Sequence, residues 1–156
     1  MNNEEFGKRI ENIRLRLYKT ALLYLGSEAF ALDAVDEAVY KALCSYKKLR
    51  QPEYFDTWIT RILINECYNE LRRQKRFRPL EELPEGATEE FDTLPLKEAI
   101  RRLPRELKEV VILRYFAGYT LIETAETLQI PQGTVATRQR KALKVLKLEL
   151  SEEVGE

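Results

Sequence analysis

The 156-residue sequence contains no histidine, so the commonest general base of enzyme active sites is missing. It also has neither a glycine-rich phosphate-binding loop nor the Gly-x-Ser-x-Gly pattern of a nucleophile elbow. We therefore expect a protein that acts by binding, not an enzyme.

Cysteine is nearly absent as well. Cys44 and Cys67 stand singly inside helix-like patterns, without the paired spacing of metal ligands. With no histidine to complete a site, we expect no metal and no other cofactor. Both cysteines are then expected to be buried as small hydrophobic side chains.

Long apolar runs are also missing. No stretch approaches the length that spans a bilayer, and residues 1–19 are charged throughout, without the apolar core of a signal peptide. We expect a cytoplasmic protein that does not insert into a membrane.

The sequence shows no β-type alternation and no internal repeat, whereas apolar residues recur at helical spacing. Gly26 and Pro52 interrupt the pattern in the first half, and Pro104, Gly118 and Pro131 interrupt it in the second. An all-α fold is predicted. The first half contains three periodic sets: Ile13, Leu17, Ala21 and Leu25; Ala34, Ala38, Ala42 and Tyr46; Ile59, Leu63, Cys67 and Leu71.

Between the two helical halves lies a segment without sustained periodicity. Residues 79–95 hold three prolines, one glycine and many acidic residues, a composition typical of a flexible linker. The sequence therefore predicts two small helical domains, 1–77 and 96–156, joined by an acidic linker, 78–95.

Charge is unevenly distributed although the net charge is zero. Residues 59–79 hold six basic and two acidic groups. Residues 81–98 hold one basic and seven acidic groups, and residues 131–150 hold five basic groups and one acidic group. Each run alone is explained by a solvated helix face. Together they place two basic segments on either side of an acidic one, a distribution that a charged partner would sense.

Residues 120–143 combine two amphipathic segments with a very short connection, Gln129 to Gly133. Such a connection forces the two apolar faces to pack across each other, as in a helix-turn-helix. Ala125 is small where the backbones would be closest, and Pro131 marks the start of the second helix. The apolar faces are predicted to be Leu121, Ile122, Ala125 and Leu128 on the first helix, and Val135, Ala142, Leu143 and Leu146 on the second.

The second helix of this pair opens with little bulk, because Gly133 and Thr134 lie in its first turn. Small, polar and basic residues follow on the side away from the apolar face, which suits a DNA major groove. A plain helical hairpin with a solvated face is the alternative. We favour DNA binding because several cues coincide, and the expected exposed set is Gln132, Ala136, Thr137, Arg140 and Lys141.

Three segments resemble one protein family in the expected order. Residues 103–147 resemble the C-terminal promoter-binding domain of bacterial sigma factors, and IPQGTVATRQRKAL is similar to the IPxGTVxSRxxRA pattern of the extracytoplasmic-function group. Residues 31–43 resemble the helix that binds core polymerase. Residues 55–76 resemble the helix that melts and reads the −10 promoter element.

The resemblance implies a sigma factor that directs promoter-specific transcription initiation. Its partners would be core RNA polymerase, promoter DNA and an anti-sigma factor. Polymerase contacts would come from the helix at 28–46, with Asp33, Asp36, Glu37 and Tyr40 as candidates. The −35 element would be read by Gln132, Gly133, Thr134, Ala136, Thr137, Arg138, Arg140, Lys141 and Lys144.

The helix at 55–76 is expected to bury Ile59, Ile62, Leu63, Cys67 and Leu71. Its other face mixes cations, amides and an aromatic ring, which suits single-stranded DNA. By the resemblance, residues 51–57 form a loop that captures a flipped base, whereas Trp58 is either a core anchor or a base-stacking residue. The candidate −10 residues are Tyr54, Phe55, Trp58, Arg61, Asn65, Tyr68, Asn69, Arg72 and Arg73.

The sequence also departs from the family pattern. Gln129 replaces a usual glycine, so either the turn is rearranged or a non-glycine residue adopts a left-handed conformation at about 1–2 kcal/mol. Ala136 stands where the family often has a basic residue, Asp36 stands where it often has glutamine, and Val39 stands where it often has phenylalanine.

Two other classes of protein stay open for this sequence, namely a polymerase-independent helix-turn-helix regulator and a helical adaptor that binds an acidic protein.

Overall fold

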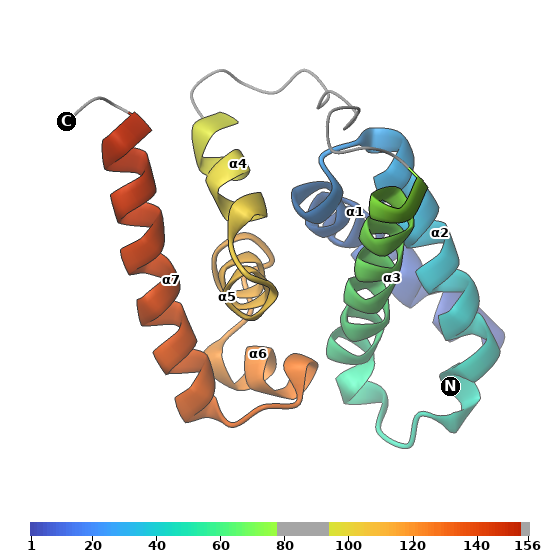
Figure 1. Cartoon of the computed structure of the whole chain (residues 1–156). Coiled ribbons are helices and arrows are strands. Elements are labelled where there is room, and N and C mark those ends of the chain that lie inside the picture. Colours follow the sequence, from blue (N-terminus) through green and yellow to red (C-terminus); the bar gives the residue numbers. More distant parts are fainter. Residues whose placement is uncertain (78–93, 154–156) are drawn as a thin grey trace. The chain divides into compact units, whose positions relative to one another are not determined.

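The computed structural model describes residues 1–77 and 94–153 (Figure 1). The chain divides into two compact units, Met1–Ala87 and Thr88–Glu156, which are described separately. All regular structure among the described residues is helical, so the predicted all-α class is confirmed.

The described part of the first unit, residues 1–77, contains three helices and two short 3₁₀ turns. The helices are α1 (Asn3–Leu25), α2 (Glu28–Ser45) and α3 (Phe55–Phe77). The 3₁₀ turns η1 (Tyr46–Lys48) and η2 (Pro52–Tyr54) form the connection between α2 and α3. Each of the three helices packs against the other two.

Local capping explains the sharp turn between α1 and α2. Gly26 adopts a left-handed conformation with φ of 69°, and its N–H donates to the carbonyl of Leu22 at 2.8 Å. This is the usual glycine termination of a helix, because glycine has no Cβ to clash there. Ser27 then caps α2, where its hydroxyl accepts a hydrogen bond from the N–H of Phe30 at 3.3 Å.

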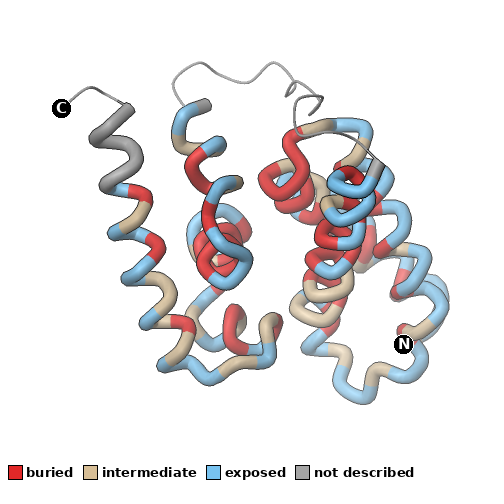
Figure 2. The backbone as a smooth tube through the Cα atoms, viewed as in Figure 1, coloured by how far each residue is buried: buried red, intermediate tan, exposed pale blue. Residues whose placement is uncertain are grey.

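The core of the first unit lies where the three helices face one another (Figure 2). The three predicted periodic sets are buried, except that Leu71 is only half-buried. Alanines at positions 31, 34, 38 and 42 give α2 a narrow side against its neighbours. Close packing of this kind makes apolar burial efficient, at about 25 cal/mol per Å² removed from water.

Aromatic rings complete this core. Phe6 stacks on Tyr46 at 4.6 Å between centroids and meets the edge of Phe55 at 5.8 Å. Tyr24 of α1 packs edge-to-face against Tyr68 of α3 at 5.4 Å. Both Phe55 and Tyr68 therefore belong to the core, with consequences for the site described below.

The first described helix of the second unit begins at Leu94, two residues before the predicted domain start at residue 96. Its helices are α4 (Leu94–Arg102), α5 (Arg105–Val111), α6 (Leu121–Leu128) and α7 (Gln132–Glu153), with a π-helical turn η5 (Ile112–Phe116) after α5. Pro95 lies in the first turn of α4, where a missing N–H costs little. The rest of the predicted linker, 78–93, lies outside the described residues.

The predicted breaks in the second half are confirmed. Helix α4 ends just before Leu103-Pro104, and α7 starts directly after Pro131. Gly118, between η5 and α6, adopts a left-handed conformation with φ of 74°. The core contains Val110, Ala125 and Val135, with Leu121, Leu128 and Ile130 packed against them.

The two cysteines lie in different environments. Cys67 is buried as predicted, but Cys44 is exposed. The prediction for Cys44 was wrong because two residues separate it from Ala42, which turns it about 200° away from the buried side of α2. Within the described ranges, no helix combines the length and apolar character that a bilayer crossing requires.

Candidate nucleic-acid interface

The turn between α6 and α7 sets the geometry of the C-terminal site. Thr120 and Glu123 form a reciprocal capping box that fixes the start of α6. At its end, Gln129 is left-handed with φ of 57° and ψ of 47°, and its N–H donates to the carbonyls of Ala125 and Glu126. Of the two alternatives for the missing glycine, the left-handed non-glycine residue is correct.

The start of α7 is capped by backbone groups. The carbonyl of Pro131 accepts from the N–H groups of Thr134 at 3.0 Å and Val135 at 3.2 Å. A Cβ built on Gly133 would meet nothing within 4 Å, so neighbouring atoms do not require the glycine. The first turn of α7 is thus open on the side of Gly133.

Packing between α6 and α7 differs from the prediction at two positions. Ala125 and Val135 share the core cluster, as expected. Leu143 is 43% exposed, because it lies about 80° around α7 from Val135 and the contact is narrower than predicted.

Ile122 is 54% exposed, whereas Thr124 and Thr127 are buried on α6. The two threonines tolerate burial because their hydroxyls donate to the carbonyls of Thr120 at 2.9 Å and Glu123 at 2.8 Å. The apolar pattern therefore placed the buried side of α6 incorrectly at Ile122.

The structure gathers most of the predicted −35 set on the side of α7 opposite Val135. The basic members of this set are Arg138, Arg140, Lys141 and Lys144, and none of them forms an ion pair with another described residue. Their charges are thus available to an anionic partner. Gln132, Gly133, Thr137, Arg140, Lys141 and Lys144 are exposed, and Thr134, Ala136 and Arg138 are half-buried.

The predicted −10 set on α3 is more divided. Tyr68 is 8% exposed, so the expectation that it lies on an accessible face of the helix was wrong. Phe55, a candidate for lining the base-capturing loop at 51–57, is fully buried. The reason is that α3 packs against both α1 and α2. The ring of Tyr24 on α1 packs edge-to-face against the ring of Tyr68 and covers it. Tyr54, Asn65, Asn69, Arg72 and Arg73 are exposed, and Trp58 and Arg61 are half-buried.

A pocket of about 550 Å³ lies between the C-terminal half of α2 and the first half of α3. Trp58, Asn65 and Asn69 line it from α3, and Tyr40 and Cys44 line it from α2. Trp58 packs on the buried ring of Phe55 at 5.8 Å between centroids and also borders the pocket, so its position is compatible with either of the two roles left open by the sequence.

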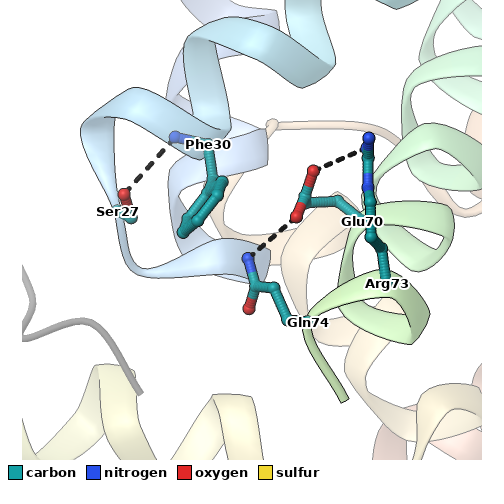
Figure 3. Close-up of polar contacts among 5 residues, drawn as sticks. All are labelled: Ser27, Phe30, Glu70, Arg73 and Gln74. Atoms are coloured by element: carbon teal, nitrogen blue, oxygen red, sulfur yellow. Dashed lines mark hydrogen bonds and ion pairs between the residues drawn. The ribbon is translucent and has the colours of Figure 1, made fainter. Parts of the chain in front are cut away.

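Several polar side chains of α3 already have partners. Arg72 donates to Asn69, and Lys41 of α2 pairs with the buried carboxylate of Glu66. Figure 3 shows Glu70 between Arg73, at 2.7 Å, and Gln74, at 3.2 Å. The hydrogen bond with Glu66 raises the pKa of Lys41 more than partial burial lowers it.

Comparisons with known proteins agree with this arrangement. Residues 10–77 match the family model for sigma-70 region 2, and residues 99–148 match that for sigma-70 region 4. The chain is 34% identical to the RNA polymerase sigma factor SigV of Bacillus subtilis over 141 residues, covering 87% of this chain and 85% of SigV. It is 30% identical over 132 residues to the ECF RNA polymerase sigma factor SigM of Mycobacterium tuberculosis, covering 81% and 67%.

The chain belongs to the extracytoplasmic-function group of the sigma-70 family. It is a sigma factor that directs promoter-specific transcription with core RNA polymerase. This membership decides against the two other classes that the sequence left open.

Solved structures share the fold of this sigma factor. The sigma factor RpoE from Bartonella quintana, in complex with the anti-sigma factor NepR, matches with a TM-score of 0.78 at 20% identity, covering 95% of this chain and 98% of RpoE. CnrH, in complex with the cytosolic domain of CnrY, matches with a TM-score of 0.76 at 22% identity, covering 97% and 90%.

The candidate polymerase contacts of this sigma factor lie on the outer side of α2. Asp33, Asp36 and Glu37 are exposed, and Tyr40 is 61% exposed. The three acids line a groove of about 640 Å³ together with Asn69, Glu70 and Arg73 of α3. Asp36 already pairs with Arg14 of α1 at 2.8 Å.

Sequence reasoning missed a polar network behind the sigma factor's C-terminal helix. Arg114 and Tyr115 of the π-helical turn η5 hydrogen-bond to Gln139 of α7. The only signal was an arginine within the apolar stretch VVILRYF, which gave no indication of its partner 25 residues away. No group of three acidic or cysteine side chains in the described parts is arranged to hold a metal ion.

Proposed function

We propose a division of work between the two units of this sigma factor. The first, residues 1–77, binds core polymerase and opens and reads the −10 element, while the second, from residue 96, reads the −35 element. Residues 78–95 join them. The protein works in the cytoplasm, by binding and not by catalysis.

The observation that carries the −35 assignment is the bare face of α7. Its cations lack ion-pair partners in the described part of the chain, and the first turn is open beside Gly133. A helix with an accessible N-terminal turn and basic residues opposite its buried side fits a major groove. Arg140 is the candidate for a base edge, and Lys144 for a phosphate.

For the −10 element, the pocket beside Trp58 is the supporting feature. Two amides, Asn65 and Asn69, border a space of about 550 Å³ that also has aromatic walls. Amide groups hydrogen-bond base edges, and aromatic rings stack on unpaired bases. We assign Asn65 and Asn69 to capture of unpaired promoter bases.

Polymerase binding is assigned to α2. Asp33, Asp36, Glu37 and Tyr40 form an exposed surface with three carboxylates, which would attract a basic polymerase segment. We further propose that an anti-sigma factor controls this protein, because the solved structure of RpoE, which has the same fold, is a complex with the anti-sigma factor NepR.

The test is the double variant Asn65→Ala with Asn69→Ala, assembled with core polymerase. Transcription from a closed duplex promoter should fall, while polymerase binding survives because α2 is a different element. A template with a pre-opened bubble should recover part of the activity, since strand opening no longer depends on base capture.

Permanganate footprinting of unpaired thymines measures opening, and a pull-down measures polymerase binding. Asn12→Ala on α1 is a matched control, because Asn12 is an exposed asparagine on a different helix. Wild-type opening by the double variant would refute the assignment of α3 to melting.

A further inference from the structure

The π-helical turn η5 holds the most unusual polar network in the second unit. In this turn the N–H of Ala117 donates to the carbonyl of Ile112 at 2.9 Å, five residues back. Such widened turns are rare and recur at functional sites.

The network joins three parts of the second unit. Arg114 donates through Nη1 to the carbonyl of Tyr119 at 2.8 Å and through Nε to Oε1 of Gln139 at 3.0 Å. Gln139 in turn donates through Nε2 to the hydroxyl of Tyr115 at 3.0 Å. Gln139 of α7 is thereby hydrogen-bonded to two residues of the turn, one of which, Arg114, also bonds to the backbone just before α6.

The location of Gln139 gives these bonds a role in recognition. It directly precedes Arg140 and lies within one turn of Thr137, both members of the exposed face of α7. Helix α7 packs against α4, α5 and α6, and Val135 shares an apolar core cluster with Val110 and Ala125. Hydrogen bonds are more directional than apolar contacts, so the network adds a directional restraint on rotation of α7 about its own axis.

A small rotation would matter for base recognition. With side chains an α-helix has a radius of roughly 5–6 Å, so turning it by about 10° moves its surface by about 1 Å. Recognition groups need to be held within about 0.5 Å of their productive position. Without the network, Arg140 would therefore meet base edges less selectively.

We propose that Gln139 is a positioning residue that sets the orientation of α7 for −35 recognition, acting through Arg114 and Tyr115. It need not contact DNA itself. This inference rests on the proposed −35 function of the second unit. It predicts a loss of sequence discrimination, distinct from a loss of DNA affinity or of fold.

The experiment uses full-length protein with core polymerase in run-off transcription. The measured quantity is the ratio of transcription from the preferred promoter to that from promoters with single −35 substitutions. Gln139→Ala removes both side-chain bonds and should lower this ratio about five-fold, by analogy with the loss of a base contact. Tyr115→Phe removes one bond and should lower the ratio about two-fold.

Gln139→Glu is the conservative variant. Its carboxylate accepts from Arg114 and from the hydroxyl of Tyr115, so the ratio should stay close to wild type. Its added negative charge should weaken binding to all sequences alike. Glu126→Ala, an exposed position on α6 outside the network, is the control and should leave the ratio unchanged.

Thermal unfolding of each variant is measured alongside. A wild-type ratio for Gln139→Ala would overturn the inference, and so would an equal loss on every promoter. A loss for Gln139→Glu as large as that for Gln139→Ala would also overturn it. If wild-type protein shows no dependence on the −35 sequence at all, the proposed function fails and this inference fails with it.

Discussion

On α3, three of the polar side chains assigned to DNA already have neighbours as partners: Arg72 donates to Asn69, and Arg73 donates to the buried Glu70. On α7, Arg140, Lys141 and Lys144 form no ion pair with any described residue. Under the proposed assignments, the C-terminal face would present its charge to DNA without losing an ion pair. The N-terminal face would first exchange these internal partners for bases and phosphates.

This contrast fits the different tasks proposed for the two helices. Binding an intact duplex needs exposed charge, which attracts phosphates without any rearrangement. Capturing bases from an opened strand should happen only when polymerase has aligned the promoter, and the internal partners of Arg72 and Arg73 on α3 would then oppose premature binding. Each of the following predictions tests one side of this comparison.

The largest effect on stability is expected at Tyr68, which was predicted to contact DNA but is buried in the core. Tyr68→Ala should destabilise the first unit by about 3–5 kcal/mol, because a buried aromatic ring is removed from its contact with Tyr24. Calorimetry should show a lowered transition for this unit and an unchanged one for the second. The exposed neighbour Asn69→Ala should change stability by no more than about 0.5 kcal/mol; equal, small effects of both would mean that Tyr68 is accessible.

A smaller effect is expected from the bare face of α7. Arg140→Ala should weaken −35 recognition by about 1–3 kcal/mol and alter base preference, as for a contact to a base edge. Lys144→Ala should lower affinity for all sequences alike and make the salt dependence shallower. Binding measured over a salt series with holoenzyme separates the two, and equal, sequence-blind losses would remove Arg140 from the base-reading set.

The internal pairing on α3 has its own test in Lys41→Met. This change leaves the carboxylate of Glu66 buried without its cation and should cost about 1–2 kcal/mol at neutral pH. The hydrogen bond with Glu66 raises the pKa of Lys41 above its ordinary value of 10.5, so this stabilisation is fully present below that value and is lost as pH rises through the raised pKa.

The measurement is the difference in unfolding free energy between wild type and Lys41→Met from pH 7 to 11. The difference should stay constant at first and narrow only at the alkaline end. A difference that already narrows near neutral pH would contradict the role of Lys41 as the titrating partner.

The smallest effect is expected at the turn before α7. Gln129→Gly should stabilise the second unit by about 0.5–1 kcal/mol, because glycine adopts the left-handed conformation without a Cβ penalty. Glu126→Gly, inside α6, should instead destabilise the unit by a similar amount. Thermal unfolding of both variants is the check, and a destabilised Gln129→Gly would show that the glutamine side chain itself supports the turn.

Much of the fold followed from local sequence signals. The helical periodicity correctly predicted a buried row on α1, α2 and α3, although Ile62 and Leu71 are only half-buried. Pro131 located the start of α7. Gln129 in place of glycine predicted either a rearranged turn or a left-handed non-glycine residue, and the structure has the left-handed residue. These features depend on residues close together in the chain, which is why they could be predicted.

The failures concern contacts between distant residues. Periodicity gave α3 one buried side, whereas packing against two helices also buries Tyr68. The apolar pattern overestimated the buried sides of α6 and α7 at Ile122 and Leu143. The hydrogen bonds between Arg114, Tyr115 and Gln139 span more than twenty residues, and no local rule pairs such side chains.

The shortness of α6 has a consequence for the dynamics of the second unit. Helices of fewer than about 12–15 residues are marginal in water by themselves, and α6 has only eight. Its amide protons are therefore protected from exchange only while α7 remains packed against Ala125. Occupation of α7 by DNA should slow hydrogen exchange in α6, so that a helix with no assigned DNA contact reports on the state of the one beside it.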